Sequence, residues 1–350
     1  MKIIIASDNG VRQEHFRIAF DEIAKKHVVK IVEVDRSISF TPTTQSEKKL
    51  KEYIGSPIQL LKEIDNADIL IVNYAPITEE VIESDRNLKL IGVTRGGVVN
   101  IDVEAATKRG IFVVNAPERT VEAVADLTIG LMIAEARNIA RAYHMLKTGK
   151  VLKINPRLFK DANIAGIELP GKTLGIIGLG RIGRKVTSRA KAFGMNVIAY
   201  DPYISKEEAV SLGLELKDMN TLLRESDFVT IHVRYTKETE HMIGRKELEM
   251  MKKTAYIINT SRGGVIDEEA LYEALKSKRI AGAALDVVER EPIDPNNPLL
   301  QLDNITITPH IAGLTQEVPM KSAVIMAEEV KKFIDGERLD RLVNKEVLLK

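Results

Sequence analysis

The chain has 350 residues, with 51 basic and 50 acidic side chains, so its near-neutral charge gives no general attraction to nucleic acid or anionic membranes. It has no cysteine, which excludes disulfides, thiolate nucleophiles and cysteine metal sites. Hydrophobic residues make up 44% of the chain, but none of the apolar runs has membrane-spanning length. The apolar stretch at the N-terminus is too short for a signal peptide. We therefore expect a cytoplasmic globular protein, long enough for two domains.

Apolar runs alternate with helical patterns in the first third of the chain. We expect strands at residues 3–6, 28–34, 69–72, 90–93 and 111–114. This alternation predicts a parallel sheet with helices on both faces. One long helix is expected at residues 120–146, and an irregular segment follows it up to Pro170.

A second alternating series begins after Pro170. Its expected strands are residues 174–177, 197–200, 228–233, 255–259, 281–285 and 305–307. Six strands with intervening helices match the dinucleotide-binding architecture. A helix is predicted at 315–335, and no further strand is expected after it. We therefore expect this helix to pack in the first domain rather than to connect strands of the second sheet. The prediction is an α/β fold of two doubly wound parallel-sheet domains, Rossmann-like or flavodoxin-like, with a cleft between them. The substrate domain would comprise 1–118 and 313–350, and the nucleotide domain 119–312.

A glycine motif opens the second series. Gly178 permits a tight turn, Gly180 lets a pyrophosphate approach the backbone, and Gly183 lets the following helix pack closely on its strand. Asp201 ends the next strand, where its carboxylate can accept hydrogen bonds from ribose hydroxyls and would repel a 2′-phosphate. NAD is therefore predicted over NADP, although Lys206 keeps NADP open as the alternative. A glycine-rich turn without a ligand is the other interpretation, and the flanking strands and the acid disfavour it.

Reactive side chains are expected after the strands that point toward the nicotinamide. Arg262 follows the fourth strand of the second series and has a planar fork of donors that can bind a carboxylate and polarise a carbonyl. His310 follows the sixth strand and can exchange a proton near neutral pH. A carboxylate against the other ring nitrogen would favour the imidazolium, and Glu291 is the candidate. Spacing alone does not separate Glu291 from Glu289.

Less specific interpretations of these residues remain open. His310 could be a structural histidine with a hydrogen bond at a strand end, and Arg262 could be a surface arginine beside the acids that follow it. Of the five other histidines, His232 is expected near the cofactor because it lies close to the end of the third strand.

Motifs spread over most of the chain resemble the D-isomer-specific 2-hydroxyacid dehydrogenase family. They are Asn100-Ile-Asp102, residues 123–126, 171–183, 259–267 and 283–287, Glu291-Pro292 and Thr308-Pro-His310. The resemblance implies an NAD-dependent enzyme that interconverts a D-2-hydroxy acid and its 2-oxo acid, with Arg262, Glu291 and His310 as catalytic residues. It also implies a homodimer or a higher homo-oligomer.

The resemblance further implies that backbone N–H groups of the turn at Arg95, Gly96 and Gly97 bind the substrate carboxylate. Arg95 departs from the family pattern. It could contact a second carboxylate, a phosphate or a hydroxyl-rich tail, or pair at the surface with Glu104 or another acid. No metal site is predicted. The predicted dinucleotide contacts are Gly178, Gly180, Arg181, Ile182, Gly183, Asp201, Pro202, Val233, Arg234, Thr239, Thr260, Asp286 and Gly313.

Two other residues and one segment also depart from the family pattern. Asp126 stands where the family has glutamate, Arg234 stands where proline is more common, and residues 147–169 form a longer, lysine-rich insertion.

A D-3-phosphoglycerate dehydrogenase is an alternative within the class, although the chain ends at Lys350 without the regulatory domain that some of those enzymes append. Less favoured is a dinucleotide-sensing binding protein that resembles the corepressors of this family.

Overall fold

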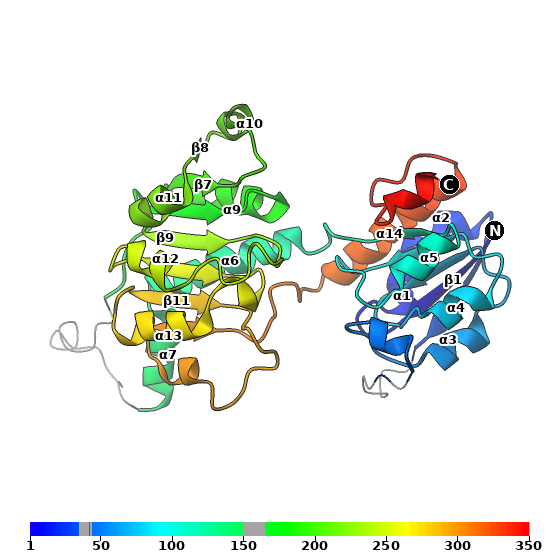
Figure 1. The fold of residues 1–350 in the computed structure, drawn as a ribbon, viewed down its shortest axis with the longest axis horizontal. Coiled ribbons are helices and arrows are strands. Elements are labelled where there is room, and N and C mark those ends of the chain that lie inside the picture. The colour runs from blue at the N-terminus through cyan, green and yellow to red at the C-terminus, as the bar shows by residue number, and fades with distance from the viewer. Residues whose placement is uncertain (35–41, 43, 150–164, 350) are drawn as a thin grey trace. The chain divides into compact units, whose positions relative to one another are not determined.

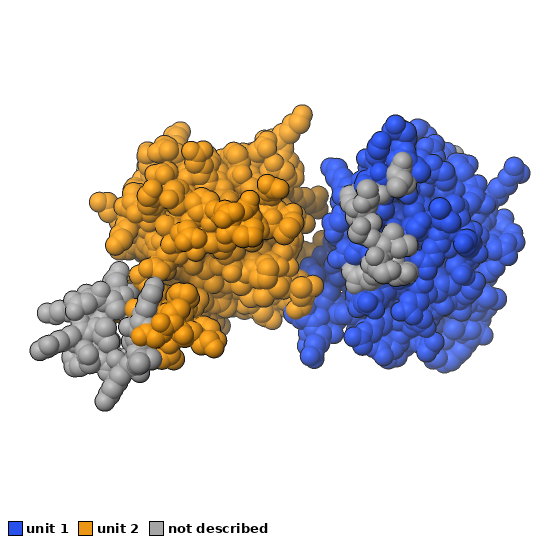
Figure 2. Space-filling model, turned by 90° about the horizontal axis from the view of Figure 1, so that it is seen from below, with its two compact units in different colours: residues 1–120, 315–350 blue, residues 121–314 orange. Residues whose placement is uncertain are grey.

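The computed structural model describes residues 1–34, 42, 44–149 and 165–349. The chain forms two compact units: unit 1 is Met1–Thr120 with Thr315–Lys350, and unit 2 is Val121–Leu314 (Figure 1; Figure 2). The boundaries predicted from the sequence lie after residues 118 and 312. Four basic side chains of the predicted insertion, Lys150, Lys153, Arg157 and Lys160, lie outside the described residues.

Unit 1 is built on a sheet of five parallel strands in the order β2-β1-β3-β4-β5. The strands are β1 (Lys2–Ser7), β2 (Val28–Glu33), β3 (Ile69–Val72), β4 (Leu90–Val93) and β5 (Phe112–Val114). Ile5 of β1 is level with Ile31 of β2 and Ile71 of β3. This is the flavodoxin-like order, in which the chain starts near the middle of the sheet and is wound outward in both directions.

Helices cover both faces of this sheet (Figure 1). Side chains alternate between the faces of a strand, so Ile4 of β1 packs in one core while Ile3 and Ile5 pack in the other. The core around Ile4 includes α3 (Pro57–Glu63), α4 (Glu79–Ser84) and α5 (Val103–Lys108). The core around Ile3 includes α1 (Gln13–Ala19), α2 (Asp21–Ala24) and α14 (Val318–Ile334). The helix from the end of the chain therefore belongs to unit 1, as its lack of a strand predicted.

Unit 2 is built on seven parallel strands in the order β12-β11-β10-β9-β6-β7-β8. The strands are β6 (Thr173–Ile177), β7 (Asn196–Tyr200), β8 (Glu215–Leu216), β9 (Phe228–Ile231), β10 (Tyr256–Asn259), β11 (Gly282–Leu285) and β12 (Ile305–Ile307). The predicted count of six strands is wrong, because β8 has two residues and is too short to show hydrophobic periodicity. With β8 included, the sheet has the doubly wound order, and that order reverses between β6 and β9.

Unit 2 also has a separate core on each face of its sheet. One core packs α6 (Val121–Ala136), α9 (Arg181–Ala192) and α10 (Lys206–Ser211) against the strands. The other packs α11 (Met219–Glu225), α12 (Arg245–Met250) and α13 (Glu268–Lys276). Burial on both faces explains why the strand sequences are nearly continuous apolar runs.

The single helix expected at residues 120–146 is wrong. The structure has two helices there, α6 and α7 (Ile139–Lys147). Between them Asn138 has φ 53° and ψ 36°, a left-handed conformation that interrupts a right-handed helix. Asparagine adopts this conformation more readily than most residues do, but the apolar spacing of the segment continues through the break and conceals it.

Candidate active site

The glycine turn of unit 2 joins β6 to α9. Gly178 has φ +93°, and a Cβ on it would lie 2.8 Å from the carbonyl oxygen of His232. A Cβ on Gly183 would lie 2.3 Å from the carbonyl oxygen of Gly178. Both glycines are therefore required by the fold itself.

Gly180 differs from these two glycines, because a Cβ on it would meet no atom within 4 Å. It is the N-cap of α9, a helix of 12 residues, and no side chain caps that end. Open space beside an uncapped helix N-terminus suits an anion, since the first N–H groups and the helix dipole both favour negative charge. These features fit the diphosphate of a dinucleotide.

Asp201 follows β7 and is held against the glycine turn. Its Oδ2 accepts a hydrogen bond of 2.8 Å from the N–H of Leu179, which lies between Gly178 and Gly180. Its Oδ1 accepts one of 2.9 Å from the N–H of Tyr203. Each carboxylate oxygen can accept a further bond, so the side chain remains able to receive ribose hydroxyls.

The other predicted dinucleotide contacts all belong to unit 2. The half-buried Val233 lies beside Gly178, with Cγ1 3.0 Å from the Cβ that Gly178 lacks. Arg234 is exposed, and Thr239 donates a bond of 2.6 Å to its carbonyl oxygen. Thr260 is buried, with its hydroxyl 2.8 Å from that of Thr128. The remaining predicted contacts are Arg181 and Ile182 in the first turn of α9, Pro202 directly after Asp201, and Gly313 after Ala312.

The predicted catalytic residues follow three neighbouring strands whose ends are level. Asn259 of β10 pairs in register with Leu285 of β11, which pairs with Ile307 of β12. Arg262 lies three residues after β10, and Gly263 follows it directly. A Cβ on Gly263 would lie 2.0 Å from the carbonyl oxygen of Val288. The loop that carries Arg262 therefore lies in direct contact with the backbone of the loop that leads to Glu291.

His310 and Glu291 form a hydrogen-bonded pair. Nδ1 of His310 lies 2.6 Å from Oε2 of Glu291. A carboxylate only accepts hydrogen bonds, so Nδ1 must carry the proton, and Nε2 is the ring nitrogen available to a substrate. Both side chains are partly exposed, at 49% for His310 and 38% for Glu291, so the pair is open to small molecules.

Asp286, predicted as a dinucleotide contact, holds the loop that carries His310. The side chain is almost fully buried directly after β11. Its Oδ1 accepts bonds from the Thr308 hydroxyl at 2.6 Å and the Ile311 N–H at 2.9 Å. Its Oδ2 accepts a bond from the Ala312 N–H at 2.8 Å, and its backbone oxygen accepts one from the His310 N–H at 2.9 Å. Four bonds from one buried residue therefore fix the position of the histidine.

A second histidine–glutamate pair lies near the first and was not found by sequence reasoning. Nε2 of His241 lies 2.8 Å from Oε1 of Glu289. Glu289 also accepts a bond of 3.1 Å from the N–H of Glu268. These contacts assign Glu289 and Glu291 to different histidines, a distinction that their spacing in the sequence left open.

His232 is half-buried next to the glycine turn, with its Nδ1 atom inaccessible to solvent. Burial lowers the pKa of His232 to about 3, so the ring is neutral at physiological pH. Nε2 lies 3.1 Å from the hydroxyl of Thr230, whereas Nδ1 has no hydrogen-bond partner within the described part of the chain. The N–H of His232 donates to the carbonyl oxygen of Ile177 at 2.7 Å. This histidine thus supports the turn and is unsuited to proton exchange near neutral pH.

In unit 1, the turn at Arg95, Gly96 and Gly97 follows β4. The hydroxyl of Thr94 donates a bond of 2.8 Å to Oδ1 of Asn73, and the Gly96 carbonyl oxygen accepts one of 2.7 Å from the Asn115 amide. The N–H groups of Gly96 and Gly97 donate no hydrogen bond to any described residue. Two adjacent free N–H donors at this bend are available to an anion.

Arg95 is held inward at this turn, with its side chain only 13% exposed. Its Nη2 donates to Oε1 of Glu52 at 2.7 Å, and its guanidinium lies 4.2 Å from the centre of the Tyr74 ring. Its Nη1 is buried and has no hydrogen-bond partner among the residues described. Of the acids suggested as a partner of Arg95, the structure shows Glu52 and not Glu104, which pairs with Lys108 at 2.7 Å.

Within the described ranges, none of the helices combines the length and hydropathy that crossing a membrane requires. No group of three or more histidine, aspartate or glutamate side chains there is arranged to hold a metal ion.

Residues 129–312 match the family model described as "D-isomer specific 2-hydroxyacid dehydrogenase, NAD binding domain". The D-3-phosphoglycerate dehydrogenase of Methanocaldococcus jannaschii is 52% identical over 288 residues, which are 82% of this chain and 53% of that protein. The glyoxylate reductase of Korarchaeum cryptofilum is 42% identical over 292 residues, 83% of this chain and 86% of that protein. The chain thus spans about half the length of the phosphoglycerate dehydrogenases that it matches and most of the reductases.

A solved structure supports the same assignment of the fold. The NAD-complexed D-isomer-specific 2-hydroxyacid dehydrogenase of Lactobacillus delbrueckii has a TM-score of 0.77 and 26% identity, and the match covers 98% of this chain and all of that one. Two α/β units with parallel sheets are therefore the shared architecture.

Proposed function

Because this chain belongs to the D-isomer-specific 2-hydroxyacid dehydrogenase family, we propose that it is an oxidoreductase that uses NAD to interconvert a D-2-hydroxy acid and its 2-oxo acid. The observation that carries the proposal is the 2.6 Å bond between His310 and Glu291, on loops that follow the strands of the unit with the glycine turn. Bound at that turn, NAD supplies or accepts the hydride.

In this proposal His310 exchanges the proton. During reduction Nε2 gives a proton to the substrate oxygen as the carbonyl becomes a hydroxyl, and during oxidation Nε2 removes it. Glu291 accepts the Nδ1–H bond, which fixes the tautomer and the ring orientation. Its negative charge also stabilises the imidazolium that forms when Nε2 is protonated.

Arg262 is proposed to bind the substrate carboxylate and to polarise the neighbouring carbonyl. Its Nη1 donates to the Ser261 carbonyl oxygen at 2.7 Å, which leaves further donors of the guanidinium fork for a ligand. The free N–H groups of Gly96 and Gly97 in unit 1 are proposed, from the resemblance to the family, as donors to the substrate carboxylate. Charge-assisted bonds of this kind give both affinity and orientation.

The preference for NAD over NADP is proposed to rest on Asp201. The carboxylate is held 2.8 Å from the Leu179 N–H, beside the turn that would receive the diphosphate. Ribose hydroxyls can donate to it, whereas a 2′-phosphate would place negative charge against negative charge. The predicted dinucleotide contacts around the turn form the rest of this proposed site.

The test is turnover. The purified protein should oxidise NADH, followed by its absorbance, with at least one member of a panel of 2-oxo acids that includes glyoxylate, hydroxypyruvate, pyruvate and phosphohydroxypyruvate. Arg262→Ala and His310→Ala should abolish most of this turnover while NADH still binds. Normal turnover by both variants would contradict the roles proposed here. Binding of NADH without turnover of any 2-oxo acid would instead favour a dinucleotide-sensing protein.

Within the class, a D-3-phosphoglycerate dehydrogenase is the second candidate. Two relatives of that name, 52% and 45% identical, support it. A glyoxylate reductase is 42% identical and a hydroxypyruvate reductase is 44% identical, so the panel must decide between these substrates.

A homo-oligomer is also proposed. None of the residues of α7 is buried, and Ile139, Tyr143 and Leu146 are 54%, 62% and 55% exposed on it. Their spacing places them on one side of the helix, where a second copy of the chain could cover them. Light scattering of the purified protein tests this proposal, and a monomer would contradict it.

A further inference from the structure

Arg119 lies on a segment that runs beside the turn at Arg95 in unit 1. The Ala116 N–H donates to the Arg95 carbonyl oxygen at 2.8 Å, and a Cβ on Gly96 would lie 3.5 Å from Cα of Pro117. The Asn115 amide bonds the Gly96 carbonyl oxygen at 2.7 Å. The two segments are therefore fixed to one another within a single unit, and Arg119 follows directly.

Among the residues that the structure describes, Arg119 is a cation without an acidic partner. Its side chain makes no hydrogen bond or ion pair with any described residue. Burial lowers the pKa of Arg119, because it disfavours the charged guanidinium. The positive charge of Arg95 also lowers this pKa, whereas Tyr74 raises it. The acid next to Arg119 in the sequence does not compensate, because Glu118 bonds Nε of Arg341 at 2.9 Å. Arg95 and Arg119 are thus two partly buried cations of one unit, and Glu52 is their one ion-pair partner within the described part of the chain.

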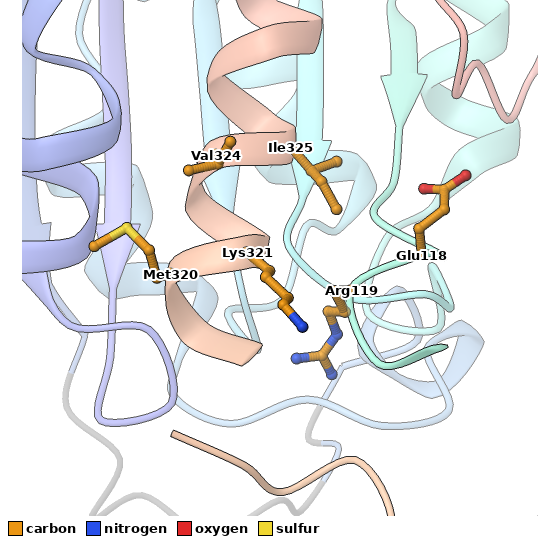
Figure 3. Close-up of a pocket in the computed structure, with 6 residues that line it drawn as sticks. All are labelled: Glu118, Arg119, Met320, Lys321, Val324 and Ile325. Atoms are coloured by element: carbon orange, nitrogen blue, oxygen red, sulfur yellow. The ribbon is translucent and has the colours of Figure 1, made fainter. Parts of the chain in front are cut away.

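A pocket of about 220 Å³ lies at Arg119. Its lining residues are Glu118, Arg119, Met320, Lys321, Val324 and Ile325. Figure 3 shows Lys321 reaching from the N-terminal end of α14 toward the Arg119 guanidinium, while the Glu118 carboxylate points away. The pocket therefore combines two cationic side chains with an apolar wall. Its volume exceeds the roughly 30 Å³ that one water occupies in the liquid, so it has room for a phosphate or a carboxylate.

We propose that Arg119 and Arg95, with Lys321 at the rim, form a subsite for a second anionic group of the substrate. The inference rests on the proposed function and names its substrate class: 2-oxo and 2-hydroxy acids with a phosphate or a second carboxylate at the far end. The turn at Gly96 and Gly97 binds the carboxylate next to the reacting carbon. The neighbouring arginines bind the distal anion.

Chemistry favours an anion over other occupants of this pocket. Guanidinium groups match phosphate and carboxylate oxygens with paired N–H donors, and the buried Nη1 of Arg95 is a donor without an acceptor. An anion bound here would also relieve the repulsion between the two arginines. A neutral or cationic group would leave the repulsion between the two arginines in place.

The experiment compares two matched pairs of 2-oxo acids with NADH as reductant. Phosphohydroxypyruvate differs from hydroxypyruvate by a phosphate, and 2-oxoglutarate differs from 2-oxopentanoate by a carboxylate. The parent should prefer the doubly anionic member of at least one pair by about tenfold or more in kcat/KM, as expected for a charge-assisted hydrogen bond. The preferred pair identifies the anion as phosphate or carboxylate.

Arg119→Gln should remove this preference, mainly by raising KM for the doubly anionic acid, and should change the singly charged acid by less than about threefold. Arg119→Lys should restore part of the preference, because the charge returns without the fork. Arg338→Gln is the control for net charge, since Arg338 is an exposed arginine of the same unit.

Two outcomes overturn the subsite while the proposed function stands: a parent with no preference in either pair, or an Arg119→Gln variant that loses both members of a pair equally. Failure to turn over any 2-oxo acid would refute the proposed function instead. In that case the subsite is tested by thermal unfolding with inorganic phosphate. Millimolar phosphate should raise the Tm of the parent and of Arg338→Gln but not of Arg119→Gln, and an unchanged Tm in the parent overturns the inference.

Discussion

Nδ1 of His310 lies 2.6 Å from Oε2 of Glu291, whereas the neighbouring acid Glu289 bonds His241 at 2.8 Å. Two glutamates separated by a single residue thus serve two different histidines. Of the two histidines, only His310 lies on the loop that the buried Asp286 fixes with four hydrogen bonds. This difference makes the two glutamates a matched pair for experiment.

We expect Glu291→Gln to reduce kcat/KM by about 100-fold, a typical contribution of general acid–base catalysis. Glutamine can still accept a bond from Nδ1–H, but it lacks the charge that stabilises the imidazolium. Glu289→Gln is the control and should change kcat/KM by less than about threefold, because its partner is His241. The measurement is the steady-state kcat/KM of both variants relative to the parent. Equal losses would show that Glu291 has no special relation to the reacting proton.

Gly180→Ala should weaken NADH binding without destabilising the fold. A Cβ at Gly180 meets no atom of the protein within 4 Å and would occupy the space proposed for the diphosphate. We expect Kd for NADH to rise about tenfold or more, measured by calorimetry, with Tm nearly unchanged. Gly183→Ala is the contrasting variant, because its Cβ would lie 2.3 Å from the Gly178 oxygen and should lower Tm. Unchanged NADH affinity in Gly180→Ala would argue against this turn as the diphosphate site.

Asp201→Ala should reduce the preference for NADH over NADPH. The variant removes the carboxylate that accepts from the Leu179 and Tyr203 N–H groups and with it the charge that repels a 2′-phosphate. The ratio of kcat/KM for NADH to that for NADPH is the measurement, and we expect it to fall about tenfold. A parent protein that prefers NADPH would contradict the argument from Asp201.

Stability should depend on pH through Glu135 of α6. The side chain is buried, accepts a bond from the Thr306 hydroxyl, and burial raises its pKa from 4.5 to about 7. The folded state then binds the proton more tightly than the unfolded state does. Its contribution is therefore fully present below the unfolded pKa of 4.5 and is lost as pH rises to about 7, by up to about 3 kcal/mol.

Glu135→Gln keeps an acceptor for Thr306 and cannot ionise. Its free energy of unfolding, relative to the parent, should therefore be higher at pH 8 than at pH 5. Denaturant unfolding at the two pH values measures this difference. A difference that is the same at both pH values would mean that Glu135 does not titrate in the folded protein over this range.

Much of the fold could be predicted from the sequence because the strands of both sheets are buried on both faces and appear as continuous apolar runs. The edge strand Glu215–Leu216 was missed because two residues carry no periodicity. The helix break at Asn138 was missed because one left-handed residue does not alter the apolar spacing around it. Arg119 gave no signal either, since nothing local distinguishes an arginine that will lie beside the turn at Arg95.

The sequence by itself determined the two parallel-sheet units, the glycine turn and the strand ends after which Arg262, Glu291 and His310 are found. These features depend on local periodicity and on residues that are close in the chain, such as Gly178, Gly180 and Gly183. Spacing left Glu289 and Glu291 open and only the resemblance to the family favoured Glu291. The tertiary structure showed that Glu291 meets His310, that Asp286 fixes the histidine loop, and that the segment leading to Arg119 packs against the turn at Arg95. Such pairings depend on how loops after different strands pack together, and side-chain contacts between distant segments leave no pattern in a single sequence.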